Sequence, residues 1–243
     1  MDLATVFFGL FLGLFAPTSI KVFRQSWVIW SRTRRLTNVY VFMIWAETVV
    51  NLIFAITTYL FIQGVIPSCF NWVVCQTVLL WTLQVQLLTQ IIANRVALIM
   101  VDKHKSRLMK WLLFGLVGVV NISVFVIWIP AHMEISPFWV NFNSIWERLE
   151  KCFFLVVDCG LNFFFLYLVR FNLIAKGLTK YSRLFQFNAF IVCVSIAMDG
   201  LLLGLLSLKN SYIYVQFAPV AYIVKLNIEL TMAVLISKVA RSA

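Results

Sequence analysis

The stretch from residue 111 to residue 131, WLLFGLVGVVNISVFVIWIPA, contains no charged side chain and follows directly on the basic segment KHKSRLMK at residues 103–110. About 20 apolar residues in a helix are enough to cross the roughly 30 Å hydrocarbon core of a bilayer. Basic residues beside such a span are retained in the cytoplasm. The stretch therefore predicts a membrane-spanning helix whose first residues lie at the cytoplasmic face.

Similar apolar windows occur on both sides of this one, and together they cover most of the chain. The predicted spans are residues 3–23, 38–63, 72–94, 111–131, 149–170, 184–206 and 217–237. Hydrophobic residues make up 63% of the chain and charged residues 12%, whereas an average soluble domain is about half apolar and a quarter charged. We expect an all-α, polytopic membrane protein, with residues 1–243 forming a single transmembrane domain that is a seven-helix bundle.

The basic residues predict the orientation of this bundle. Sixteen of the twenty Lys and Arg residues lie in or beside alternate connections between the predicted spans. These sixteen are Lys21, Arg24, Arg32, Arg34, Arg35, Arg95, Lys103, Lys105, Arg107, Lys110, Arg170, Lys176, Lys180, Arg183, Lys238 and Arg241. This alternation predicts an outer or lumenal N-terminus and a cytoplasmic C-terminus. It also explains the net charge of +11 without nucleic acid, which we do not expect as a partner.

Four carboxylic acids lie well inside predicted spans, each on a different helix: Glu47, Asp158, Asp199 and Glu229. An ionisable group at this depth costs at least a few kcal/mol, so it usually faces the bundle interior or a wet cavity. Neutral side chains could hold the helices together at a lower desolvation cost. The four acids are therefore the candidate catalytic residues.

Further polar residues stand one turn from several of these acids or share a face on the third predicted helix. These supporting candidates are Asn51, Gln86, Gln90, Asn94, Asn162 and Lys225. Together they predict polar faces that converge on a central pocket. Interhelical hydrogen bonds, including a Lys225–Glu229 pair, are the alternative.

Other chemistry is not indicated by the sequence. The chain contains no Gly-rich phosphate loop, paired-histidine zinc motif or Gly-x-Ser-x-Gly elbow, and we expect neither a cofactor nor a metal ion. The sequence leaves undecided whether one disulfide forms among Cys69, Cys75 and Cys152. Glu147 and Lys151 are spaced for a helical salt bridge in a solvated outer connection.

Two short segments resemble the fungal membrane-bound terpene cyclases of meroterpenoid pathways. They are Trp45-Ala46-Glu47 in the second predicted helix and Asn227-Ile228-Glu229 in the seventh. In that family, acids on these two helices protonate an epoxide or alkene of a prenylated substrate. Most of the chain also resembles a broad group of fungal polytopic membrane proteins, through Asn94-Arg95, Trp128-Ile129-Pro130 and Ile145-Trp146-Glu147-Arg148.

Two other seven-helix families fit less well. Asn94-Arg95-Val96 stands where G-protein-coupled receptors place an acidic residue, Arg and Tyr, but here Asn94 replaces the acid. A microbial rhodopsin would have a retinal-binding lysine at the position of Lys225, yet the residue four earlier is Ala221 where an aspartate is expected.

The resemblance implies an intramembrane, proton-initiated cyclase of fungal secondary metabolism that acts on a prenylated lipophilic substrate. The resemblance reaches only Glu47 and Glu229. Our hypothesis assigns proton donation to Glu47 or Asp199, and substrate positioning or proton return to Glu229 and Asp158. Expected partners are the substrate, membrane lipids, and a pathway prenyltransferase and epoxidase. The expected location is the endoplasmic reticulum. A seven-helix receptor or sensor, and a small-solute or proton-coupled transporter, are the alternatives.

Overall fold

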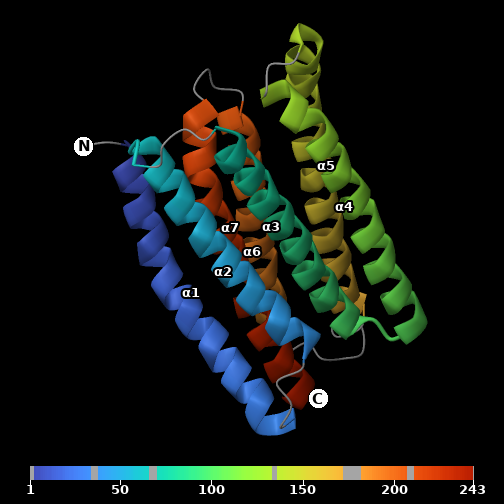
Figure 1. The fold of residues 1–243 in the computed structure, drawn as a ribbon. Coiled ribbons are helices and arrows are strands. Elements are labelled where there is room, and N and C mark those ends of the chain that lie inside the picture. Colours follow the sequence, from blue (N-terminus) through green and yellow to red (C-terminus); the bar gives the residue numbers. More distant parts are fainter. Residues whose placement is uncertain are drawn as a thin grey trace.

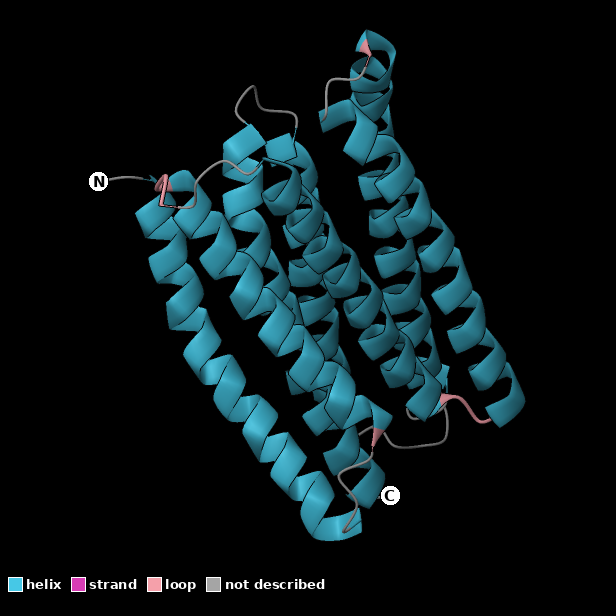
Figure 2. Ribbon diagram, in the orientation of Figure 1, coloured by secondary structure: helices cyan, strands magenta, loops and turns pink. Residues whose placement is uncertain are grey.

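The computed structural model describes residues 3–33, 38–65, 70–132, 136–171, 182–206 and 211–242, and within these ranges the regular elements are helices. They are α1 (Leu3–Thr33), α2 (Val39–Ile62), α3 (Phe70–Ile99), α4 (Lys103–His132), α5 (Pro137–Val169), α6 (Ser182–Leu206) and α7 (Ser211–Ser242). The helices run side by side along the long direction of one bundle (Figures 1 and 2). The all-α bundle predicted from the apolar windows is confirmed for the described residues.

Six of these helices are long and apolar enough to cross a membrane, which indicates a multi-pass membrane protein. The helix outside this set is α3, whose apolar residues are interrupted by Gln84, Gln86 and Gln90. It contacts four other helices, α2, α4, α5 and α7, so much of its surface is covered by protein. A helix covered by its neighbours needs fewer apolar side chains than one that faces lipid.

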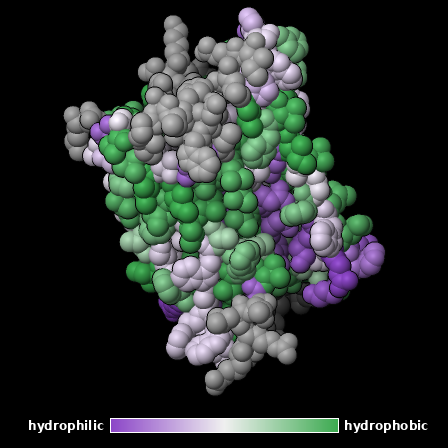
Figure 3. All heavy atoms as spheres, viewed as in Figure 1, coloured by the Kyte–Doolittle hydropathy of each residue, from purple (hydrophilic) through white to green (hydrophobic). Residues whose placement is uncertain are grey.

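The helices, α3 included, form a closed ring in chain order. Consecutive helices pack against one another, and α7 also packs against α1 and α2, so that the ring closes. Large apolar side chains are exposed on the outside, among them Phe42, Trp111 and Phe190. Figure 3 shows this apolar surface over the middle of the bundle. Such a surface is unusual for a soluble monomer and suits contact with acyl chains.

The helix ends differ from the predicted spans at several places. α5 begins at Pro137, whereas the predicted span begins at residue 149, so the segment expected to be a loop is helical. Ser136 caps this helix by accepting a hydrogen bond from the backbone N–H of Phe138, and Pro137 suits the first helical turn because its missing N–H needs no partner there. Apolar windows mark the membrane part of a helix and miss its amphipathic extension.

A proline, Pro219, lies within the first third of α7. The side-chain amide of Asn51 on α2 donates to the carbonyl oxygen of Pro219 (3.2 Å) and accepts from the backbone N–H of Ile223 (3.0 Å). These two backbone groups belong to the helical turn that follows the proline. Asn51 therefore ties α2 to the part of α7 that leads to Lys225.

Candidate functional site

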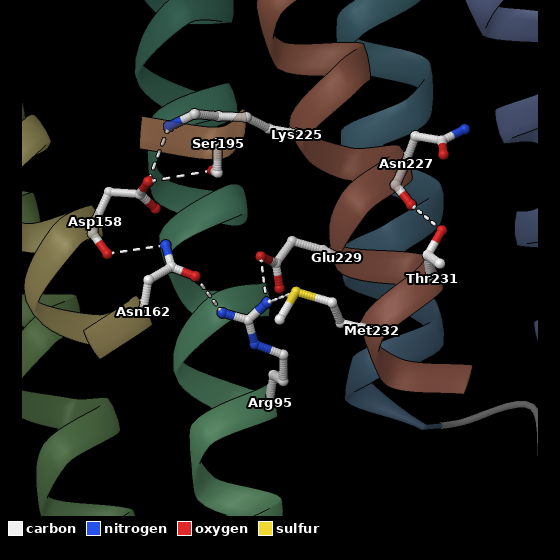
Figure 4. A network of polar contacts seen from close by, with 9 residues as sticks. All are labelled: Arg95, Asp158, Asn162, Ser195, Lys225, Asn227, Glu229, Thr231 and Met232. Carbon is white, nitrogen blue, oxygen red and sulfur yellow. Dashed lines mark hydrogen bonds and ion pairs between the residues drawn. The ribbon is translucent and has the colours of Figure 1, made fainter. Parts of the chain in front are cut away.

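One lysine inside the bundle binds two carboxyl groups from two other helices. The Nζ atom of Lys225 on α7 lies 2.5 Å from Oδ1 of Asp199 on α6 and 3.2 Å from Oδ2 of Asp158 on α5. The hydroxyl of Ser195, one turn before Asp199, donates to the same oxygen of Asp158 (3.4 Å). We call Asp158, Ser195, Asp199 and Lys225 the lysine cluster, most of which Figure 4 shows.

The lysine cluster holds more acid than base. Two carboxyl groups share one ammonium ion, and Oδ1 of Asp158 and Oδ2 of Asp199 have no hydrogen-bond partner among the described residues. Like charges held close together in a medium of low dielectric constant repel strongly, and burial disfavours each ion further. A second positive charge, either a proton or a small cation, would neutralise the site.

A second group of side chains lies further along α5 and α7 and includes Arg95 from α3. The Nη1 atom of Arg95 on α3 donates to Oε1 of Glu229 on α7, and its Nη2 atom donates to Oδ1 of Asn162 on α5, both at 2.7 Å. The guanidinium also contacts the sulfur of Met232 and lies 4.4 Å from the ring centroid of Phe165. We call Arg95, Asn162, Glu229 and Met232 the arginine cluster. Arg95 and Glu229 are each 2% exposed.

The two clusters are joined through α5. The side-chain N–H of Asn162 donates to the backbone carbonyl of Asp158 (2.9 Å), while its oxygen accepts from Arg95 (Figure 4). Asp158, Asn162 and Phe165 recur every three or four residues, so they lie on one face of α5. A continuous polar network therefore connects α3, α5, α6 and α7.

A cavity of about 40 Å³ adjoins the lysine cluster. Its walls include Asp158, Asp199 and Lys225 together with the aromatic residues Phe154 and Tyr222. This volume is room for about three water molecules. Pockets for drug-sized ligands measure roughly 300 to 1,000 Å³, so a prenylated substrate would need the helices to separate.

The structure brings some of the predicted site residues together and separates others. Asp158, Asp199 and Lys225 meet, and Asn162 connects them to Glu229. The predicted alternative of a Lys225–Glu229 pair is wrong, because these residues pair with the aspartates and with Arg95. Glu47 is fully buried on α2, and neither of its oxygens has a hydrogen-bond partner among the described residues. It does not line the cavity.

Gln86, Gln90 and Asn94 of α3 face α4 rather than the cavity. Gln90 donates to the backbone carbonyl of Lys110, and the ammonium group of Lys110 donates to Asn94, both at 3.5 Å. Asn121 donates to Gln86 at 3.2 Å. Figure 3 shows hydrophilic atoms along this boundary between α3 and α4. The expectation that these residues join the central pocket is therefore wrong.

Arg95 is the main site residue that sequence reasoning missed. The predicted span ends at residue 94 and leaves Arg95 to the cytoplasmic connection, whereas α3 continues to Ile99 and buries it. One feature of the sequence could have indicated a long-range partner for Arg95: no acidic residue stands beside it in the chain. The required carboxylate comes from Glu229 on α7 instead.

The structure also gives Lys151 a different acidic partner from the predicted Glu147. Lys151 binds Glu150, with Nζ and Oε1 2.8 Å apart, and both side chains are largely buried rather than solvated.

The side chains of Cys69, Cys75, His132 and Glu134 lie outside the described residues. Cys152 is a free, exposed thiol. Among the described residues, no group of three or more His, Cys, Asp or Glu side chains is arranged to hold a metal ion.

Comparison of the chain with known protein families, with curated proteins and with solved structures gave no match. Its function is therefore inferred from the geometry of the two clusters and the cavity.

Proposed function

We propose that the chain is a seven-helix membrane sensor, in which the lysine and arginine clusters hold the inactive arrangement of α3, α5, α6 and α7. The single observation that carries this proposal is the continuous network from the cavity at Asp199 to Arg95, one turn before the end of α3. Coupling between two distant places in a protein needs an element with two discrete arrangements. Interhelical ion pairs that are either made or broken supply such an element.

The proposed topology places the two ends of this network on different sides of the membrane. All seven helices cross, with the N-terminus outside and the C-terminus in the cytoplasm. The alternation of basic residues supports this, and the contacts of α3 with four other helices account for its lower apolar content. The cavity then lies on the outer side of the arginine cluster, and the end of α3 faces the cytoplasm.

The second carboxylate of the lysine cluster makes the network sensitive to added positive charge. A ligand or proton that adds positive charge beside Asp158 and Asp199 would compete with Lys225 for them. Such a ligand shifts the protein toward whichever arrangement binds it better. Loosening Asp158 would move Asn162 and so weaken its bond to Arg95. The change in the arginine cluster would then alter the arrangement of the helices at the cytoplasmic end.

A double-mutant cycle tests whether the clusters act as one unit. The full chain in lipid nanodiscs is compared with Ser195→Ala, Glu229→Gln and the double variant, by hydrogen exchange along α6 and α7. We expect a coupling free energy of about 0.5 to 3 kcal/mol, the range for residues in one network. Effects of the two substitutions that simply add would show that the clusters are independent, and the sensor proposal would then fail.

A second candidate function is the intramembrane cyclase implied by the sequence resemblance. The observation that favours it is the pair of aspartates with unbonded oxygens at a cavity whose walls include Phe154 and Tyr222. Two carboxyl groups that share one cation can hold a proton between them, and aromatic faces stabilise cations in a dry site. The small volume of the cavity makes this the weaker candidate.

Incubation with a prenylated epoxide separates the two candidates. Microsomes that contain the chain should leave the compound unchanged if the protein is a sensor. A cyclase would convert it, and Asp199→Asn, Glu47→Gln or Glu229→Gln would remove the activity while the protein still inserts. We propose the endoplasmic reticulum as the location, because lipophilic prenylated compounds partition into its membrane.

A further inference from the structure

A third cation inside the bundle belongs to neither cluster. The ammonium group of Lys151 on α5 lies 3.7 Å from the ring centroid of Trp81 on α3 and 5.5 Å from that of Tyr214 on α7. Its charge is balanced by Glu150, 2.8 Å away. Trp81 and Tyr214 are both buried. Two aromatic faces and a carboxylate from three helices therefore surround one ammonium ion.

We propose that Trp81, Tyr214 and Glu150 form a binding site for a small organic ammonium ion, which Lys151 occupies while no ligand is bound. Aromatic faces that surround a desolvated cation are the arrangement by which proteins recognise alkylammonium groups. We call these three residues the aromatic cage. The cage is built for a positive charge and is filled by a side chain of this chain.

Displacement of the Lys151 ammonium group by a ligand cation leaves the net charge of the cage unchanged. One ammonium ion leaves the cage and another enters, so the carboxylate of Glu150 stays paired. Lysine has a long flexible stem that lets its charged end move toward water. Tyr214 lies in the first turn of α7, which begins at Ser211, so the cage is near the end of the bundle. The side chain of Lys151 is 12% exposed, so it is not completely enclosed by the bundle.

One polar atom at the cage is left without a partner. Oη of Tyr214 is buried and has no hydrogen-bond partner among the described residues. Buried polar groups are nearly always hydrogen-bonded, so an unpaired one calls for an explanation. An ammonium ligand that also carries a hydroxyl or carbonyl group could satisfy it, which the alkyl stem of Lys151 cannot do.

The cage lies next to the cavity of the lysine cluster. The ring of Trp81 packs edge to face on Phe154, with centroids 5.8 Å apart, and Phe154 lines the cavity. Lys151, Phe154 and Asp158 follow one another on the same face of α5. A ligand that displaces Lys151 would therefore press on the wall of the cavity. As the ligand site of the sensor, the cage rests on the proposed function, but its occupancy can be measured separately.

Removal of the lysine should open the cage to an added cation. Binding of choline to the full chain in nanodiscs is measured by calorimetry for the parent and for Lys151→Met. The variant should bind choline about tenfold more tightly than the parent, because the internal competitor is gone and aromatic faces stabilise the cation. Lys151→Gln serves as a second variant should the methionine variant fold poorly.

Three controls make the experiment specific to the cage. Arg148→Met removes one positive charge from an exposed position on the same helix and should bind choline as the parent does. The uncharged isostere 3,3-dimethyl-1-butanol should not bind to Lys151→Met. Adding Trp81→Leu to Lys151→Met should lower choline affinity about tenfold, which removes the cation–π contact. Equal affinity of the parent and both lysine variants, or unchanged affinity in the Trp81→Leu double variant, would overturn the cage.

The same samples separate the cage from the sensor proposal. Choline binding that leaves hydrogen exchange in α6 and α7 unchanged would support the cage and contradict the sensor function. Loss of coupling between Ser195 and Glu229, with choline binding intact, would also contradict the sensor function while leaving the cage in place.

Discussion

At the scale of single residues, the core of the bundle contains more carboxylic acids than cations to pair with them. Lys225 neutralises parts of two aspartates, Arg95 binds Glu229, and Glu47 has no described partner. A buried ion pair adds little net stability compared with apolar packing, but the loss of one partner leaves a charge stranded. The lysine and the arginine should therefore be the most sensitive single positions in the core.

Substitution of Lys225 by methionine should strongly destabilise the protein. Asp158 and Asp199 would lose their shared cation, at a cost of about 3 to 5 kcal/mol for breaking a buried pair. Thermal unfolding in detergent measures the change. Lys105→Met is the matched control, because Lys105 belongs to an exposed pair with Asp102, and surface pairs contribute little. Equal melting temperatures for the two variants would contradict the ion pairing in the core.

Arg95 should not tolerate lysine. Its planar guanidinium binds Glu229 and Asn162 through different nitrogen atoms, and a lysine ammonium cannot reproduce this fork. We expect Arg95→Lys to lose about 1 to 3 kcal/mol, the cost of a buried polar group left unpaired. Denaturant unfolding of the reconstituted chain gives the value, and Arg107→Lys at an exposed position should be close to neutral.

At the scale of helices, the ends are set by local chemistry that apolar windows do not detect. Ser136 and Pro137 start α5 well before the apolar part of that helix. Asp102 starts α4 in a similar way, because its Oδ1 accepts from the backbone N–H groups of His104 (2.9 Å) and Lys105 (3.3 Å). Capping residues thus extend helices beyond the predicted spans.

The Asp102 cap should weaken in acid. Its hydrogen bonds, first that from the backbone N–H of Lys105, lower the pKa of the carboxyl below its usual 3.8. The cap therefore stabilises α4 fully above that value, and the stabilisation is lost as the pH falls through the lower pKa of the folded state. Protection factors for the amides of His104 and Lys105 should fall over this range. Asp102→Asn should show no such pH dependence, because its amide oxygen does not titrate.

At the scale of the whole molecule, an odd number of membrane crossings would place the two ends of the chain on opposite sides of the membrane. We predict that glycosylation tags at the two ends will behave oppositely: a tag before α1 is modified in microsomes, and a tag after α7 is not. Modification of both tags, or of neither, would mean an even number of crossings. In that case α3 would be the segment that does not cross, because it falls outside the six long apolar helices.

The amino-acid sequence by itself determined that the chain forms seven helices, that most of its residues are apolar and that four acids lie within these helices. These properties depend on local composition, since spanning length, helix period and flanking charge are read over about 20 residues. Only the tertiary structure decided which acid meets which cation. Asp158, Asp199 and Lys225 come from three helices, and Arg95 reaches Glu229 from a fourth. Such contacts depend on the rotation and height of each helix against its neighbours, which packing of the whole bundle determines.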